Sequence, residues 1–270
     1  QFKVDKKLFY KNPLDILKKH QVDILFEAIG QSDGVSKKIV EAALKNGTHV
    51  ITPNKALISK HGNDLSKLAE KNNVNLEFEA SVAGGIPVLR AIKEGLATNK
   101  ISKVYGILNG TSNYILSKME LGMSYSDALS QAQELGYAEA NPTSDVEGLD
   151  TLAKVMILAN VVFDEQLIQE DIEVRGISDI TLSDVKEASS NNERWKLIGS
   201  IWKDNKGKVH GSVSPKLIPI NDSLYGISDA TNALKITSNI LGDTTIVGEG
   251  AGKIETGFAL YNDIISIANR

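Results

Sequence analysis

The sequence predicts an α/β protein in which a parallel sheet with crossover helices is followed by an α+β region. Through the first 80 residues, short apolar runs alternate with segments of helical periodicity, an order typical of parallel sheets. From Asp171 onward, short strand-like runs separated by turns dominate. A chain of 270 residues that is 41% hydrophobic is long enough to bury a core in both regions.

The first region shows the order strand, helix, strand, helix, strand. The first helix ends before Gly47, a residue type common just past a helix. Ligands of parallel sheets bind beyond the carboxyl ends of the strands, where Gly30, Asn54 and Ser81 fall. The predicted elements are a strand over 23–29, a helix over 32–46, a strand over 49–52, a helix through 65–69 and a strand over 74–80.

The second region mixes helices and strands. Pro87 suits the first position of a helix over 88–96, and Ser124 with Asp127 resembles the start of a capped helix that ends at Gly136. A glycine-rich piece at 248–257 begins a final helix. The other predicted elements are a strand over 103–110, a helix with Tyr114, Ile115 and Met119, a helix around Lys154, and strands over 195–204, 208–220 and 232–241.

Composition excludes several classes of function. The net charge of −4, with acids and bases interspersed, argues against nucleic acid or an anionic membrane surface as the main partner, so we expect a small-molecule partner. No apolar run is long enough to span a membrane and the N-terminus has no signal core, so we expect a cytoplasmic protein. The absence of cysteine excludes disulfides and thiolate catalysis, and four scattered histidines argue against a histidine-ligated metal.

Lys154 is the most informative residue, because it stands inside an apolar helical run with Asp150 one turn before it. The two charges share a helix face whose flanks are apolar. Removing both ions from water costs several kcal/mol per ion unless they pair or serve a ligand. Acids crowd the preceding loop at Glu139, Asp145 and Glu147, which indicates a site for a small amine-bearing substrate. The alternative is an ordinary exposed ion pair worth about 0.3–0.5 kcal/mol.

The glycine loop of a complete Rossmann-type sheet is missing. Such a sheet usually begins with a strand, G-x-G-x-x-G and a helix, followed about 20 residues later by an acid that holds the ribose. This chain contains neither feature and begins near what resembles the fourth strand. We therefore expect an incomplete, N-terminally truncated dinucleotide-binding domain rather than one that binds without its phosphate loop. The choice between NAD and NADP stays open, because the residue that decides it belongs to the missing part.

Several motifs occur in an order that resembles the homoserine dehydrogenase family over essentially the whole chain. They are FEAIG, GTHVITPNKAL, FEASVAGGIPVLRAI, KVYGILNGTSNYIL, LGYAEANPTSDVEGLDTLAKVMILA and GEGAG. The resemblance implies an oxidoreductase that interconverts L-homoserine and L-aspartate 4-semialdehyde with NAD or NADP in threonine and methionine biosynthesis. It also implies a homodimer built from the rest of a dinucleotide-binding domain (1–80), a mixed-sheet catalytic and dimerisation domain (81–247) and a C-terminal segment that returns to the first domain (248–270).

The resemblance also assigns site residues. Lys154 matches the general acid/base, Asp150 a substrate-binding carboxylate and Glu139 the acid that meets the substrate's amino group. Lys55 resembles a second catalytic lysine near the nicotinamide, although a solvated loop lysine is the alternative. The expected cofactor-binding residues are Lys55, Gly136, Glu139 and Gly250.

The segment EASVAGGIP resembles the family's monovalent-cation site, which we expect to hold sodium. Main-chain carbonyls would supply the ligands, and two glycines would allow the bend that converges them; a glycine hinge between domains is the local alternative. The expected ligands are the carbonyls of Glu79, Val82, Gly84 and Ile86. Asn109 and Thr111 either line the pocket or only cap a helix.

Two other functions compete with the dehydrogenase. One is a non-catalytic dimerising fragment that cannot bind dinucleotide, and the missing glycine loop is the feature that bears on it. The other is a related reductase that acts on a different semialdehyde, which turnover on related hydroxy amino acids would separate.

Overall fold

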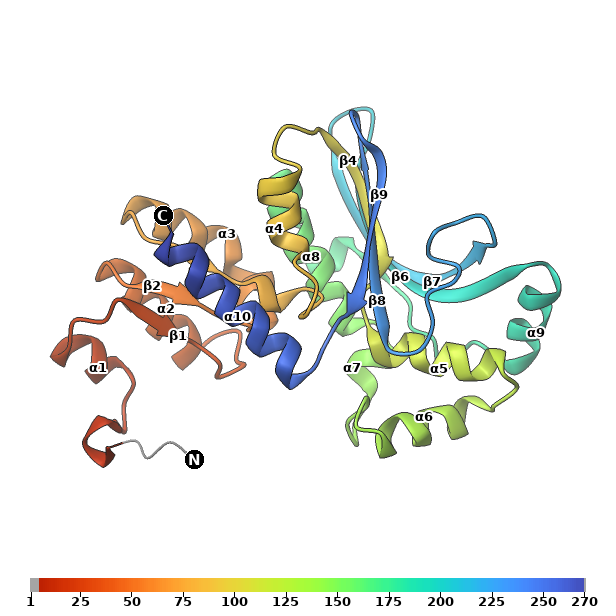
Figure 1. Cartoon of the computed structure of the whole chain (residues 1–270), viewed down its shortest axis with the longest axis horizontal. Helices are drawn as coiled ribbons and strands as arrows, with labels where there is room; N and C mark the ends of the chain where they lie inside the picture. The colour runs from red at the N-terminus through yellow and green to blue at the C-terminus, as the bar shows by residue number, and fades with distance from the viewer. Residues whose placement is uncertain (1–4, 270) are drawn as a thin grey trace. The chain divides into compact units, whose positions relative to one another are not determined.

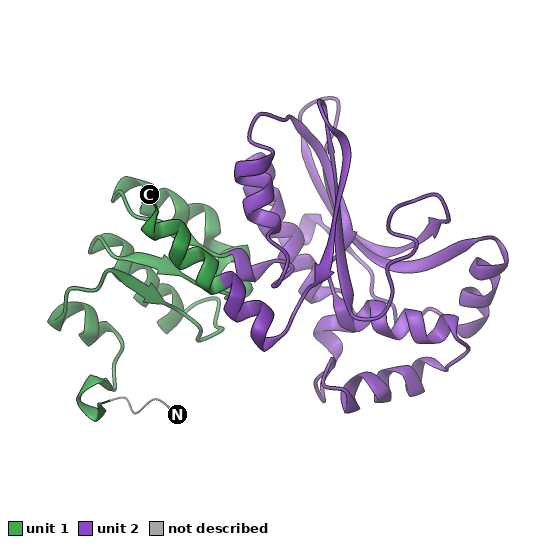
Figure 2. Cartoon of the chain, in the orientation of Figure 1, with its two compact units in different colours: residues 1–78, 260–270 green, residues 79–259 purple. Residues whose placement is uncertain are grey.

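The computed structural model describes residues 5–269, which fall into two compact units. Unit 1 comprises residues 1–78 and 260–270, and unit 2 comprises residues 79–259 (Figure 2). The ends of the expected first domain and C-terminal segment, residues 1–4 and 270, lie outside the described residues. Residues 248–259 cluster with unit 2, and unit 1 takes up the chain again from residue 260.

Unit 1 contains a parallel sheet in the order β1-β2-β3 (Figure 1). The strands are β1 (Ile24–Phe26), β2 (His49–Ile51) and β3 (Leu76–Glu77). They are joined by α2 (Val35–Lys45) and α3 (Lys55–Lys71), and preceded by the short helices η1 (Lys6–Leu8) and α1 (Leu14–Lys19). The predicted strand-helix alternation and parallel pairing are therefore confirmed, although each strand is shorter than its apolar run.

Local sequence explains where the two crossover helices begin and end. In α2, Ile39, Val40 and Leu44 are almost completely buried on one face. The helix stops before Gly47, whose φ of +77° favours glycine. α3 begins at Asn54, whose side-chain oxygen accepts a hydrogen bond from the Leu57 N–H at 3.1 Å.

Unit 2 contains a mixed sheet with the order β5-β7-β6-β4-β8-β9 within the described residues. β5 pairs parallel with β7, and the other neighbours are antiparallel. The strands are β4 (Ile101–Ile107), β5 (Glu173–Val174), β6 (Glu193–Lys203), β7 (Val209–Pro219), β8 (Thr231–Ser238) and β9 (Gly242–Glu249). The predicted fold class, a parallel sheet plus an α+β region with a mixed sheet, is confirmed.

Helices pack on one face of this mixed sheet. α8 packs against β6 and β7, while α5 and α9 pack against β6. Gly199 in β6 permits the approach of α8, because a Cβ there would lie 2.8 Å from the Thr151 Cγ2. The helices of this unit are α4 (Val88–Arg90), a π-helical turn (Ala91–Gly95), α5 (Gly110–Glu120), α6 (Tyr125–Glu134), α7 (Thr143–Val146), α8 (Leu149–Phe163), α9 (Leu182–Ser190) and the start of α10 (Lys253–Ala268).

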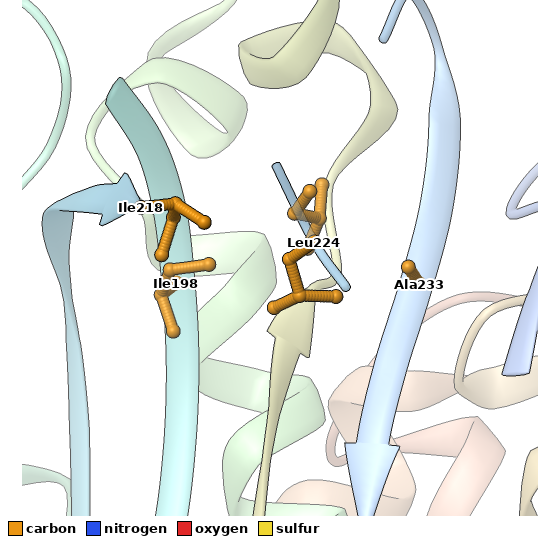
Figure 3. Packing of buried hydrophobic residues seen from close by; sticks show 5 residues of the cluster. Ile198, Ile218, Leu224 and Ala233 are labelled. Carbon is orange, nitrogen blue, oxygen red and sulfur yellow. The ribbon is translucent and has the colours of Figure 1, made fainter. Parts of the chain in front are cut away.

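A small apolar cluster lies on the sheet where the connection between β7 and β8 folds over it. Leu224 from that connection is fully buried among Ile107, Ile198, Ile218 and Ala233. Figure 3 shows Ile198 and Ile218 side by side, with Leu224 between them and Ala233. The connection therefore covers one end of this sheet face with apolar side chains.

Several short or weakly buried elements differ from the sequence-based predictions, among them α9 and β9. α9 was not expected, because only Val185 and Ala188 of its residues are buried, and its signal is the capping box of Thr181 and Asp184. β9 was missed because it is an edge strand without fully buried residues, so its alternation is weak. In addition, the predicted helix over 88–96 is a short α4 followed by the π-turn, with Pro87 just before it. Within residues 5–269, none of the helices combines the length and apolar composition that a membrane span requires.

Candidate active site

The Asp150–Lys154 pair of α8 is buried. Asp150 is 4% exposed and Lys154 is 8% exposed, and the Lys154 Nζ lies 2.7 Å from the Asp150 Oδ2. Asp150 stands in the first turn of α8, where the helix dipole favours a negative charge. Exposed ion pairs contribute little to stability, and the burial of Asp150 and Lys154 shows that this pair is not one of them.

The hydrogen bonds of Lys154 leave one donor for a ligand. The ammonium has three N–H groups. One is donated to the Leu108 carbonyl oxygen at 2.6 Å and one to Asp150. Within the described chain the third is available to an oxygen atom placed beside it.

Asn109 joins this pair to the start of α5. Its Nδ2 donates to the Asp150 Oδ2 at 2.9 Å and to the Asp145 Oδ1 at 2.7 Å. Its Oδ1 accepts from the Ser112 N–H at 2.8 Å, which caps α5. The two roles left open by the sequence, helix cap and pocket residue, are thus compatible: one side chain caps the helix and holds two carboxylates.

Two glycines fix the entry into α8. Gly148 precedes the helix with φ +80°, a conformation that L side chains rarely adopt. Gly176 lies against α7, because a Cβ there would stand 2.3 Å from the Val146 carbonyl oxygen. The turn that leads to Asp150 is therefore held by close backbone packing.

The loop after α6 carries Gly136 and Glu139. Gly136 has φ +77° and follows Leu135, the C-cap residue of α6. Thr111 donates its hydroxyl to the Tyr137 carbonyl at 2.6 Å, which ties this loop to α5. The Glu139 side chain is exposed, while its carbonyl accepts from the Gln133 Nε2 at 3.1 Å. The loop is thus anchored through its backbone and presents a carboxylate to solvent.

The segment from Glu79 to Ile86 is a tight turn. The buried Glu79 carboxylate accepts from the Leu89 and Arg90 N–H groups at 2.8 and 2.9 Å, and burial raises the pKa of this carboxyl. The Glu79 carbonyl accepts from the Val82 N–H, and the Ile86 carbonyl from the Val88 N–H. Among residues 5–269, no cluster of three His, Cys, Asp or Glu side chains could hold a metal ion.

Close packing explains the glycines at Gly84, Gly85 and Gly250. A Cβ on Gly84 would lie 2.8 Å from the Gly250 carbonyl oxygen, and one on Gly85 would lie 2.7 Å from the Glu249 carbonyl oxygen. A Cβ on Gly250 would lie 2.0 Å from the Asn232 Nδ2. Contacts within unit 2 therefore leave no room for a side chain at position 250.

Lys55 belongs to unit 1, whereas the other candidate residues belong to unit 2. It is the first residue of α3 and is exposed. In the same unit Gly30 follows β1 with φ +84°, and a Cβ there would meet no described atom within 4 Å. At the carboxyl edge of this parallel sheet, the loop after β2 thus presents the cationic side chain of Lys55. The loop after β1 has open space beside Gly30.

Sequence reasoning missed Glu27 and left the role of Asn109 undecided. Glu27 is 2% exposed and accepts hydrogen bonds from three side chains. The available signal was a carboxylate at the end of an apolar strand run, the same kind of signal that singled out Lys154.

Comparison with known proteins agrees with this architecture. A family model for homoserine dehydrogenase matches residues 87–265, and one for the homoserine dehydrogenase NAD binding domain matches residues 3–79. The chain is 49% identical over 225 residues to an NAD(+)-dependent homoserine dehydrogenase of Pseudomonas canavaninivorans, a match that covers 83% of this chain and 64% of the relative.

Solved structures give the same result. A homoserine dehydrogenase from Thiobacillus denitrificans matches with a TM-score of 0.90 and 38% identity, over 95% of this chain and 59% of that one. A hyperthermophilic archaeal homoserine dehydrogenase mutant in complex with NADPH matches with a TM-score of 0.84 and 28% identity, over 96% and 76% of the two chains.

The fold and site define a two-unit α/β protein with a parallel sheet in one unit and a buried lysine–carboxylate pair in the other. The chain belongs to the homoserine dehydrogenase family. It spans 64%, 60% and 58% of the length of three curated relatives that it matches.

Proposed function

We propose that this chain carries the catalytic groups of an oxidoreductase that interconverts L-homoserine and L-aspartate 4-semialdehyde with NAD or NADP. Family membership supports the reaction class. The observation that carries the proposal is the buried ammonium of Lys154, held by Asp150 and the Leu108 carbonyl with one N–H left over. Such a group is placed to exchange a proton with a reacting oxygen.

Proton transfer by Lys154 completes the redox reaction. A bound nicotinamide supplies or accepts the hydride. In the direction of reduction, Lys154 gives a proton to the carbonyl oxygen of aspartate 4-semialdehyde as its carbonyl carbon gains the hydride. In the direction of oxidation, the neutral amine takes the hydroxyl proton of homoserine as the hydride leaves the carbon. Asp150 stabilises the ammonium and fixes its direction.

Carboxylates around Lys154 suit the amino group of the substrate. Asp150 and Asp145 are both held by the Asn109 amide. We assign Glu139, whose exposed side chain stands on a loop tied to α5 by Thr111, to the substrate ammonium. A carboxylate of the protein beside the substrate ammonium favours an α-amino acid over a simple alcohol or aldehyde as the substrate.

Unit 1 offers groups that fit a dinucleotide. The carboxyl edge of a parallel sheet is where such ligands bind, and here it carries the open Gly30 and the exposed Lys55. Family membership adds support, because the NAD binding domain model matches residues 3–79. We assign Lys55 to the cofactor and substrate, and Gly136, Glu139 and Gly250 to further cofactor contacts, within the proposed function.

The direct test is an absorbance assay at the NAD(P)H band with the full-length natural protein that contains these residues. We expect reduction of NAD or NADP that depends on L-homoserine. Comparison with related hydroxy amino acids tests the substrate, and equal turnover on them would favour a different semialdehyde reductase.

We propose further that the carbonyls of Glu79, Val82, Gly84 and Ile86 hold a sodium ion. The tight turn, with the closely packed glycines Gly84 and Gly85, supports a carbonyl site. At a sodium concentration about tenfold above its Kd, linkage predicts a stabilisation of about 1.4 kcal/mol. Urea denaturation in sodium chloride, with choline chloride at equal ionic strength as the control, measures this difference. Equal stability in the two salts would exclude the site.

We also propose that the chain forms a homodimer. The face of the unit 2 sheet that its helices do not cover would form the interface. A hollow of about 620 Å³ on this face is lined by residues that include Tyr105, Ile198, Ser200 and Trp202. We expect Trp202→Glu to convert the dimer to a monomer, because it places a carboxylate in a dehydrated interface. Light scattering after size-exclusion chromatography measures the mass.

Leu121→Glu, at an 80% exposed residue after α5, is the matched control that keeps the dimer. A dimer that survives Trp202→Glu would contradict this interface.

A further inference from the structure

Glu27 is a buried carboxylate at the carboxyl edge of the unit 1 sheet. It follows β1 directly and is 2% exposed. A buried carboxylate is costly unless hydrogen bonds replace its hydration. Its partners therefore show what this charge does in the fold.

The donors come from both loops at this edge. On the side that leads from β1 into α2, the Ile29 N–H and the Ser36 hydroxyl donate to the Glu27 Oε1 at 2.8 and 3.0 Å. On the side that leads from β2 into α3, the Thr52 hydroxyl donates to the Oε2 at 2.7 Å. The Asn54 amide donates to the Oε2 at 3.1 Å. One carboxylate thus joins the two loops.

The bonds on the second side lead directly to Lys55. The Thr52 Oγ1 also accepts from the Asn54 N–H at 3.0 Å, and the Asn54 Nδ2 donates to the Gln31 carbonyl at 2.9 Å. Asn54 is the residue that caps α3, so its orientation sets the first helical residue, Lys55.

The site requires an acceptor-only group. Each of these contacts places an N–H or O–H against a Glu27 oxygen. A glutamine has the same shape but turns one acceptor into an NH₂ donor, which would face the Asn54 amide or the Thr52 hydroxyl. The negative charge is therefore specific to this arrangement, because neither an apolar residue nor a neutral amide satisfies the same donors.

We propose that Glu27 is a positioning residue, which joins the β1–α2 and β2–α3 loops and thereby orients Lys55 for the reaction. This inference rests on the function proposed for Lys55. It assigns no contact with substrate to Glu27, which acts through Thr52 and Asn54.

The first test is Glu27→Gln in the full-length natural protein. We expect kcat to fall about tenfold or more, because a misplacement of about 1 Å at a reacting group has effects of this size. Wild-type kcat in a folded Glu27→Gln variant would overturn the proposal.

A matched pair of milder variants separates positioning from stability. Thr52→Val and Ser36→Ala each remove one buried hydroxyl that donates to Glu27, at 2.7 and 3.0 Å. Both should lower the urea midpoint, but only Thr52→Val, on the Lys55 side, should lower kcat. Equal kcat values for the two variants would overturn the proposal, even if Glu27→Gln did not fold.

A double-mutant cycle with Lys55→Ala gives the decisive readout. If Glu27 acts through Lys55, Glu27→Gln should change kcat by less than about twofold in the Lys55→Ala background. The same loss in both backgrounds would overturn the proposal. A Lys55→Ala variant with wild-type kcat would instead reject the function proposed for Lys55, and the inference with it, while leaving the role of Lys154 intact.

Discussion

We expect replacement of Lys154 by alanine in the full-length natural protein to lower kcat for homoserine oxidation by about 1,000-fold. General acid–base groups contribute about 10² to 10⁴ to the rate, and Lys154 has one N–H beyond the two that it donates to the Leu108 carbonyl and to Asp150. The measurement is the initial rate of NAD(P)H formation at saturating homoserine, with a thermal melt to confirm that the variant is folded.

Lys154→Arg is the control that separates charge from proton transfer. Arginine keeps the positive charge beside Asp150, but its guanidinium does not release a proton near neutral pH. We therefore expect kcat to fall nearly as far as in Lys154→Ala. If Lys154→Arg kept wild-type kcat, the lysine would act only through its charge.

Asp150→Ala should destabilise the chain by about 3–5 kcal/mol, because it leaves the ammonium of Lys154 buried without its carboxylate. Urea denaturation followed by tryptophan fluorescence measures the loss. The only two tryptophans of the chain, Trp195 and Trp202, both lie in unit 2, so the signal reports on the unit that holds the pair.

A double variant tests the cause of that destabilisation. Asp150→Ala combined with Lys154→Met removes both charges and leaves an apolar side chain in the buried site. We expect the double variant to recover most of the stability lost in Asp150→Ala. Strictly additive losses would show that the two side chains do not interact in the folded chain.

The sequence predicts the architecture where periodicity is strong. The parallel order of unit 1 follows from apolar runs separated by amphipathic helices, and the hairpin of β6 and β7 follows from the turn around Gly207. The burial of Lys154 is predictable for the same reason, since a charge among apolar residues at helical spacing has no exposed face to occupy.

Other features depend on contacts between distant segments and carry no local signal. One example is the close packing of Gly250 against the buried side chain of Asn232, which belongs to strand β8. The four donors around Glu27 come from positions between 29 and 54, so no short window shows that they converge. Edge strand β9 and helix α9 bury few side chains, and their patterns are correspondingly weak.

Rescue of the Lys154→Ala variant by small primary amines tests the proton-transfer role most directly. If the Lys154 amine exchanges the proton with the reacting oxygen, added methylamine or ethylamine should enter the space left by the side chain and raise kcat in proportion to amine concentration. Tetramethylammonium, a cation without a proton to exchange, should have no effect. Wild-type turnover of Lys154→Ala without any added amine would contradict the account.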